Sequence, residues 1–141
     1  MKWSVFIMIF LITLTTSSWS QEFEESYDPN TEIAIKGKIA EVIQRNHGPV
    51  VIGIVKNDRI YHVITAPGWY IEQEKINLNM GDEVVVHGSK FFSKKGELFL
   101  IARAIHNIST GKIYLFRDEN MKPRWRGGRQ HRKKYWNSII Q

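Results

Sequence analysis

Basic and aromatic side chains are interleaved near the C-terminal end of this chain. Residues 122–134 hold seven Lys or Arg residues and no acid. Cationic side chains neutralise phosphates and similar groups, and aromatic rings stack on bases. The composition therefore predicts contact with an anionic polymer. The candidate residues are Lys122, Arg124, Trp125, Arg126, Arg129, Arg132, Lys133, Lys134 and Trp136.

Three interpretations of this segment remain open. A nucleic acid would use the cations for its phosphates and the rings for its bases. A membrane surface would use the cations for anionic head groups and the Trp side chains for the interface. Gly127, Gly128 and the lack of an apolar period also fit a solvated terminus that binds nothing.

The positive charge of the chain is concentrated in this segment. The whole sequence holds 20 basic and 14 acidic residues. Without the segment and Lys2, twelve basic residues stand against all fourteen acids, which lie between positions 21 and 121. The body is thus slightly negative, so attraction to polyanions is expected from the C-terminal segment.

The sequence contains no pattern that is typical of a catalytic or metal site. The five histidines are scattered, with no pair spaced by two or four residues. The chain has no cysteine, so disulfides and thiolate metal sites are excluded. A nuclease-like hydrolase would need a cluster of acids and arginines, for which Asp58, Arg59 and Arg103 are a thin basis. We expect no enzyme activity, no metal and no cofactor.

These side chains must be positioned by short strands. Alternating apolar residues bounded by turn residues predict six of them. The predicted strands are residues 31–44, 50–56, 59–66, 83–92, 97–107 and 112–117. Residues 69–78 change period and predict a short helix or an irregular plug between the third and fourth strands. Residues 123–125 are a candidate partner for the last strand.

The first strand contains a glycine at a position where a side chain is expected. Ile33, Ile35 and Ile39 share one face of the strand, and Gly37 falls on the same face. A missing side chain inside a strand marks a bulge, a bend or a close backbone approach. The pattern predicts a long strand that bends at Gly37 and serves two sheets of a small barrel.

The order of these elements resembles the OB-fold, over residues 31–107. That fold is an all-β, five-stranded Greek-key barrel with a helix between strands three and four. The alternative is an SH3-type barrel, which lacks a plug at that place. The resemblance implies a ligand face on strands two and three, where the candidate residues are Tyr61, His62, Trp69 and Tyr70.

Two of these candidates carry an open question about orientation. Strand alternation places Tyr61 and His62 on opposite faces, without showing which face points outward. Trp69 follows Pro67 and Gly68, and the stronger expectation for its indole is a core plug that closes the barrel end.

Three short motifs are similar to a narrower group of small exported bacterial OB-fold proteins that is largely uncharacterised. The motifs are Thr65-Ala66-Pro67-Gly68-Trp69-Tyr70, Gly81-Asp82-Glu83-Val84, and Arg117-Asp118-Glu119-Asn120 with Pro123 and Trp125. Met121 stands where that group often has glycine. The resemblance implies a binding or accessory module of the cell envelope and no reaction.

The N-terminal residues predict export to the periplasm or the medium. Residues 1–20 have a positive start, an apolar run and small residues at Ser18 and Ser20, which is the pattern of a cleaved signal peptide. An uncleaved anchor is the alternative, although the apolar run is shorter than the roughly 20 residues that span a bilayer. An acidic leader (21–30), an OB-fold domain with an appended hairpin (31–125) and a basic aromatic tail (126–141) are expected to follow.

The sequence thus predicts an exported, non-enzymatic OB-fold module of the cell envelope that contacts a protein or an anionic polymer. A peripheral contact with a membrane surface is a further alternative for the partner. The competing functions are a nucleic-acid-binding OB-fold protein and a small secreted hydrolase.

Overall fold

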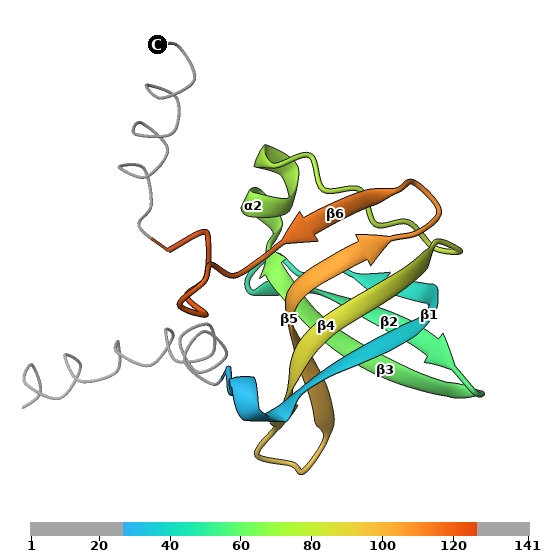
Figure 1. Cartoon of the computed structure of the whole chain (residues 1–141), viewed down its shortest axis with the longest axis horizontal. Helices are drawn as coiled ribbons and strands as arrows, with labels where there is room; N and C mark the ends of the chain where they lie inside the picture. The colour runs from blue at the N-terminus through green and yellow to red at the C-terminus, as the bar shows by residue number, and fades with distance from the viewer. Residues whose placement is uncertain (1–26, 127–141) are drawn as a thin grey trace, which may run out of the picture.

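The computed structural model describes residues 27–126 as six strands and two short helices (Figure 1). In chain order they are η1 (Pro29–Thr31), β1 (Glu32–Ile43), β2 (Pro49–Lys56), β3 (Arg59–Pro67), α2 (Gly68–Gln73), β4 (Glu83–Phe92), β5 (Leu98–Asn107) and β6 (Lys112–Leu115). Within this part of the chain no helix is long and apolar enough to cross a membrane.

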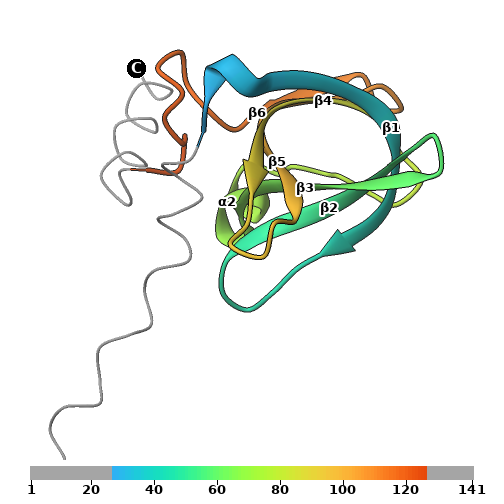
Figure 2. The same cartoon turned by 90° about the horizontal axis from the view of Figure 1, so that it is seen from below.

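The first five strands close into a barrel. The sheet order is β3-β2-β1-β4-β5-β6, and β3 also pairs with β5 in parallel, which joins the two ends of the five-stranded sheet (Figure 2). With α2 between β3 and β4, this is the OB-fold topology. The predicted fold is confirmed, and the SH3-type alternative is excluded because α2 occupies the place of the predicted plug.

One strand serves both halves of this barrel. The first half of β1 pairs with β4 and the second half with β2, and Lys38 has partners in both. A side chain at position 37 would collide with the carbonyl oxygen of Val55 and would lie 2.6 Å from Ile54 Cγ2. Gly37 therefore permits a close approach of the backbone of β2, as predicted. The bulge itself lies later, between Ile39 and Glu41.

Alternation along β3 decides the orientation that the sequence left open. Val63 and Thr65 are buried, Tyr61 packs against the core cluster, and His62 faces outward toward Glu41. Tyr70 is only 7% exposed and closes the barrel end.

The adjacent Trp69 is 48% exposed. The expectation that Trp69 is the plug is therefore wrong. Because Gly68–Gln73 is helical, neighbouring residues point in different directions, and the helix turns Tyr70 inward and Trp69 outward.

The first described residues belong to the folded body. Arg103 donates two hydrogen bonds to the Glu32 carboxylate, at 2.9 Å from Nε and 2.7 Å from Nη2, and the Tyr27 hydroxyl donates a third. Arg117 lies 4.8 Å from the centre of the Tyr27 ring. Burial and the Glu32 carboxylate raise the pKa of Tyr27 above its ordinary value. Residues 27–30, assigned to a loose leader by sequence, are thus part of the domain.

The C-terminal part of the body is a turn rather than a full hairpin. β6 ends at Leu115, two residues earlier than predicted, and a single bridge joins Arg117 to Pro123. Met121 has a φ of 62°, in the left-handed region that favours glycine. Met121 therefore has a backbone conformation that a glycine would adopt without strain.

The close approach at Gly37 predicts a large cost for any side chain there. Gly37→Val should lower the free energy of unfolding by about 1–3 kcal/mol, because the neighbouring atom is a backbone carbonyl that cannot rotate away. Urea denaturation measures the change, with Ala34→Val on an exposed site of the same strand as the control. An unchanged midpoint for Gly37→Val would mean that β1 and β2 have room to separate.

The Glu32–Arg103 pair predicts an acid-sensitive part of the stability. Hydrogen bonds from Arg103, against a smaller opposing effect of burial, hold the pKa of Glu32 below its ordinary value of 4.5. The contribution is therefore present above pH 4.5 and is lost as the pH falls through the lower folded-state value. The stability difference between wild type and Glu32→Gln should shrink in acid.

The matched control for this pair is Glu83→Gln, which removes the exposed Lys36–Glu83 pair. It should change stability little at any pH. An equal pH dependence of the two variants in denaturation titrations would contradict a special role for Glu32.

Candidate functional site

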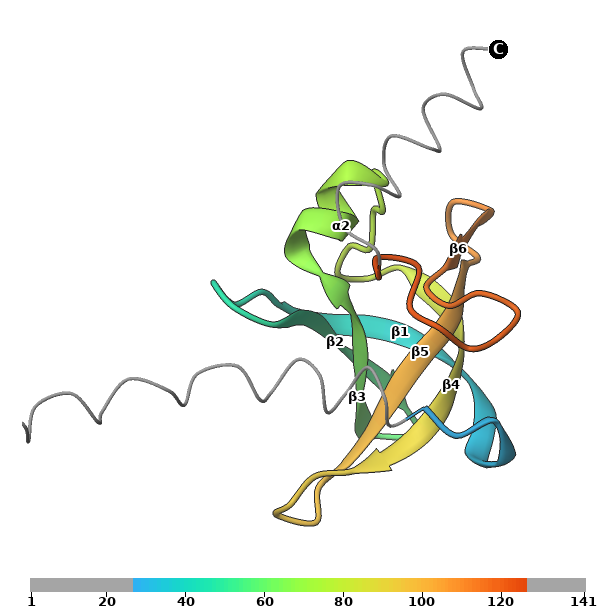
Figure 3. The ribbon, with the colours of Figure 1, turned by 90° about the vertical axis from the view of Figure 1, so that its left-hand side faces the viewer.

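A cleft of about 790 Å³ opens beside one end of the barrel. Its walls are the β1–β2 loop (residues 44–49), the start of α2 and the C-terminal turn, and its floor is formed by β3 and β5 (Figure 3). Three segments far apart in sequence therefore meet at one site because the barrel is closed.

The floor of the cleft is apolar although it lies on the outer face of the barrel. Ile64 and Ile101 are cross-strand partners and are 4% and 2% exposed. Thr65, which is also buried, donates a 2.7 Å hydrogen bond from Oγ1 to the carbonyl oxygen of Val50. This bond ties the end of β3 to the start of β2 and fixes the base of the β1–β2 loop.

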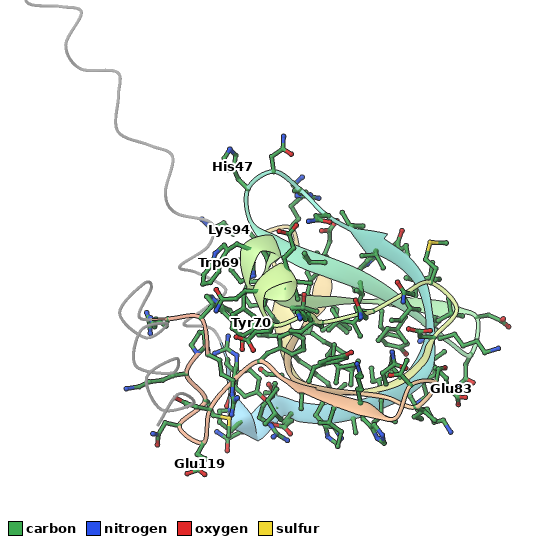
Figure 4. The ribbon with its side chains drawn as sticks, turned by 90° about the horizontal axis from the view of Figure 1, so that it is seen from above. His47, Trp69, Tyr70, Glu83, Lys94 and Glu119 are labelled. Carbon is green, nitrogen blue, oxygen red and sulfur yellow. The ribbon has the colours of Figure 1, made fainter. Side chains whose placement is uncertain are left out.

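Two indoles, those of Trp69 and Trp125, line the cleft on the side of α2. Tyr70 lies between them, 6.0 Å from the ring of Trp69 and 5.6 Å from the ring of Trp125, measured between centroids. Tyr70 is buried, whereas the adjacent Trp69 is exposed (Figure 4). The half-exposed Trp69 is therefore held on a fixed support and can stack against a flat group of a ligand.

The charged groups that line the cleft are two arginines and one acid. Arg45 comes from the β1–β2 loop, Arg117 from the C-terminal turn and Glu72 from α2. Arg117 is 4% exposed, and its Nη1 donates a 2.7 Å hydrogen bond to the carbonyl oxygen of Met121. The side chain of Arg117 is therefore held in one position at the wall, between the Met121 carbonyl and the Tyr27 ring.

A second set of side chains lies next to the floor. Glu41, Gly53, His62 and Phe99 follow one another across β1, β2, β3 and β5 in register. Glu41 Oε1 lies 2.8 Å from His62 Nε2, and it reaches there by crossing over Gly53, where a Cβ would be 2.7 Å from the same oxygen. The rings of His62 and Phe99 are 6.1 Å apart.

This carboxylate–imidazole pair is one part of a hydrolytic arrangement. A covalent mechanism would also need a nucleophile such as a hydroxyl or thiol within reach of the imidazole. The neighbours of His62 along and across the sheet are Ile60, Ile64, Gly53 and Phe99, none of which carries such a group. The contact that the structure shows for His62 is its hydrogen bond with Glu41 on the outer face.

The structure separates the four residues predicted on the barrel face. His62 faces outward beside the cleft, and Trp69 lines the cleft. Tyr61 and Tyr70 pack in or against the core, so their assignment to the ligand face is wrong. The reason for Tyr61 is strand alternation, and the reason for Tyr70 is the turn of α2.

The predicted polyanion-binding residues fall into two groups. Trp125 packs against Tyr70 and lines the cleft, and Lys122, Arg124 and Arg126 are exposed on the adjoining turn. The remaining candidates are Arg129, Arg132, Lys133, Lys134 and Trp136, and these lie outside the described residues.

Several residues of the site were not predicted. Arg45 and Arg117 were not selected because isolated arginines in loops carry no motif. Glu41 and Phe99 depend on strand register, which brings them to His62 from 21 and 37 positions away in sequence. Gly53 inside a strand was the one available signal, since such a glycine marks a close approach.

Metal ligands do not gather in the part of the chain that is described. Among residues 27–126 there is no group of three or more His, Asp or Glu side chains that could hold an ion. His62 lies on the outer face of β3, beside Glu41. His87 lies on β4, near enough to Glu32 to act on its charge.

The two neighbouring aromatics at the start of α2 predict opposite outcomes on truncation. Tyr70→Ala should lower the free energy of unfolding by about 3 kcal/mol or more, because it empties a buried position. Trp69→Ala should change it by less than about 1 kcal/mol, because half of the indole is already in water. Thermal or urea denaturation of both variants checks this, and a larger loss for Trp69→Ala would reverse the assignment of plug and surface residue.

Comparison with curated proteins finds no match. Among solved structures, one similar chain is from the crystal structure of the S. pombe Stn1-ten1 complex. It is 23% identical, with 77% of this chain and 74% of that chain covered and a TM-score of 0.43. The model of the MamS/MamX magnetosome protein family matches residues 31–110, and the chain therefore belongs to this family.

Proposed function

We propose that this chain is an exported, non-enzymatic binding module that holds an anionic polymer in the cleft. The observation that carries the proposal is the open cleft of about 790 Å³ with cations from two different elements, Arg45 and Arg117, on an apolar floor. An open site suits a segment of a long chain molecule, which enters and leaves on either side.

The charges beside the cleft support an anionic ligand. Among the described residues that line it, the one acid is Glu72, against Arg45 and Arg117. Lys122, Arg124 and Arg126 follow on the adjoining turn, and the sequence after them adds four more cations and no acid. A polymer held at the cleft would therefore meet a continuous basic segment beyond it, which strengthens binding at low salt.

Nucleic acid is the second candidate, and Trp69 is the observation that favours it. Its indole is 48% exposed and lines the same cleft as Arg45. A ring beside a cation matches the alternation of base and phosphate along a single strand. An inorganic polyanion such as polyphosphate would use the arginines and leave the indole without a flat partner.

The surroundings of the Glu41–His62 pair support binding over catalysis. None of the residues paired with His62 on the sheet offers a hydroxyl or thiol for a covalent mechanism. The family description names a cellular structure, the magnetosome, and no reaction. We propose that the chain serves that structure as an accessory protein of the cell envelope, with the signal-peptide pattern of residues 1–20 as the support for export.

Binding of labelled polyphosphate and labelled oligothymidylate to mature protein (residues 21–141) tests the proposal. Affinity should fall steeply with salt, and Arg45→Ala should reduce the slope of log affinity against log salt by about one. Lys112→Ala, an exposed cation on β6, is the control and should leave cleft binding unchanged. Failure of both polymers to bind would overturn the proposed function.

The aromatic wall separates the two candidate ligands. Trp69→Ala should weaken oligothymidylate binding by about fivefold or more and leave polyphosphate binding nearly unchanged, because only bases stack. Ile113→Ala, at a 64% exposed site on β6, is the matched control.

Exchange of Arg129, Arg132, Lys133 and Lys134 for Gln tests the tail. This variant should bind more weakly and keep its sensitivity to Arg45→Ala. If Arg45→Ala had no effect in either background, the tail and not the cleft would be the binding site.

A further inference from the structure

The end of the barrel opposite α2 carries large apolar side chains that are exposed. Phe92 is 64% exposed, Ile60 55% and Leu98 40%. They lie at the β4–β5 and β2–β3 hairpins, both of which point away from α2 (Figures 1 and 3). His62 pairs with Phe99 in parallel strands, so Ile60 lies on the face that His62 and Phe99 share, and Leu98 lies on the opposite face.

The end of the β4–β5 hairpin is apolar on both faces. Phe92 and Leu98 are cross-strand partners, so their side chains share one face. Phe91 and Phe99 are the next pair and share the other face. The turn between the strands is closed by hydrogen bonds of 2.9 Å from Ser93 N to Glu97 O and from Gly96 N to Ser93 O. The apolar pair is therefore presented on a defined hairpin.

Basic residues surround these side chains. They are Lys56 and Arg59 at the β2–β3 turn and Lys90, Lys94 and Lys95 at the β4–β5 hairpin, all exposed. The acids in the same two turns are Asp58 and Glu97. We call the exposed Phe92 and Leu98, with Lys90, Lys94 and Lys95 of the same hairpin, the basal patch.

We propose that the basal patch docks on the surface of an anionic lipid bilayer. Phenyl and aliphatic side chains enter the boundary between head groups and acyl chains, while Lys and Arg stems extend to keep their charges among the head groups. Charge complementarity selects an anionic surface, because each cation near such a surface adds to the attraction. A polyanion in water matches the cations and leaves Phe92 and Leu98 without an apolar environment.

The basal patch and the cleft are distinct sites. The cleft is lined by the C-terminal end of β3 and the start of α2, at Pro67 and Gly68, whereas the patch lies on the β4–β5 hairpin, at Phe92 and Leu98. A bilayer on the patch therefore leaves the cleft open. Few apolar side chains take part, so docking should be reversible and sensitive to salt.

A single-site fluorophore tests the proposal, because the chain contains no cysteine of its own. Mature Leu98→Cys is labelled with an environment-sensitive dye, and Ile113→Cys, at a 64% exposed site on β6, is the matched control. Vesicles of phosphatidylcholine with phosphatidylglycerol should shift the emission of the dye at position 98 to the blue and leave the dye at 113 unchanged. Vesicles of phosphatidylcholine alone should give a much smaller shift at position 98.

Vesicle sedimentation with unlabelled protein provides the second measurement. Phe92→Ser should reduce the partition constant of the protein between water and vesicles by about threefold or more, whereas Ile113→Ser should leave it unchanged. Polyphosphate binding by Phe92→Ser should equal that of wild type, which separates the patch from the cleft and the tail.

Three results would overturn the lipid assignment. The first is equal response of the dyes at 98 and 113, which would place the contact elsewhere on the chain. The second is wild-type sedimentation of Phe92→Ser, which would assign vesicle binding to the basic tail. The third is a blue shift at 98 that grows with protein concentration in the absence of vesicles, which would identify a second copy as the partner.

Discussion

The close approach of β1 and β2 at Gly37 is the constraint on which the rest of the fold depends. Because position 37 has no side chain, the Val55 carbonyl can come close, and β1 can pass from the sheet with β4 to the sheet with β2. That passage brings β3 alongside β5, where Ile64 meets Ile101. The floor of the cleft is thus a consequence of barrel closure and not of any local sequence motif.

The part of the structure that was predictable is the part that local rules control. The alternation of apolar residues, the turn residues and one glycine predicted six strands within a few residues of their observed bounds, because side-chain alternation and turn conformations depend on near neighbours. The site was predictable only for His62, Trp69 and Trp125. Its other members meet through register: Glu41 reaches His62 only because Gly53 lies between them. Likewise, no residue near Tyr27 in the sequence predicts that its ring will pack against Arg117, which lies 90 positions later.

The molecule presents two surfaces of different chemistry at the two ends of the barrel. One has aromatic rings, arginines and an apolar floor in a cleft, and the other has exposed phenyl and aliphatic groups among lysines on the β4–β5 hairpin. A single closed barrel carries both, because β3 pairs with β2 on one side and with β5 on the other. Partners at the two ends would therefore be held apart by the same packed body.

The strained backbone of Met121 shows how a small conformational cost can fix the position of Arg117 in the wall of the cleft. A methionine at a φ of 62° lies about 1 kcal/mol above its preferred conformations, a penalty that glycine would not carry. The turn tolerates it because Asp118 accepts hydrogen bonds from the backbone of Asn120 and Lys122 on either side. The same conformation aims the Met121 carbonyl at Arg117. A residue with more backbone freedom, such as glycine, would leave the orientation of that carbonyl oxygen less well defined, and the guanidinium would lose its fixed acceptor. Methionine thus makes the turn more rigid at some cost in stability, and the rigid turn fixes the position of the neighbouring positive charge.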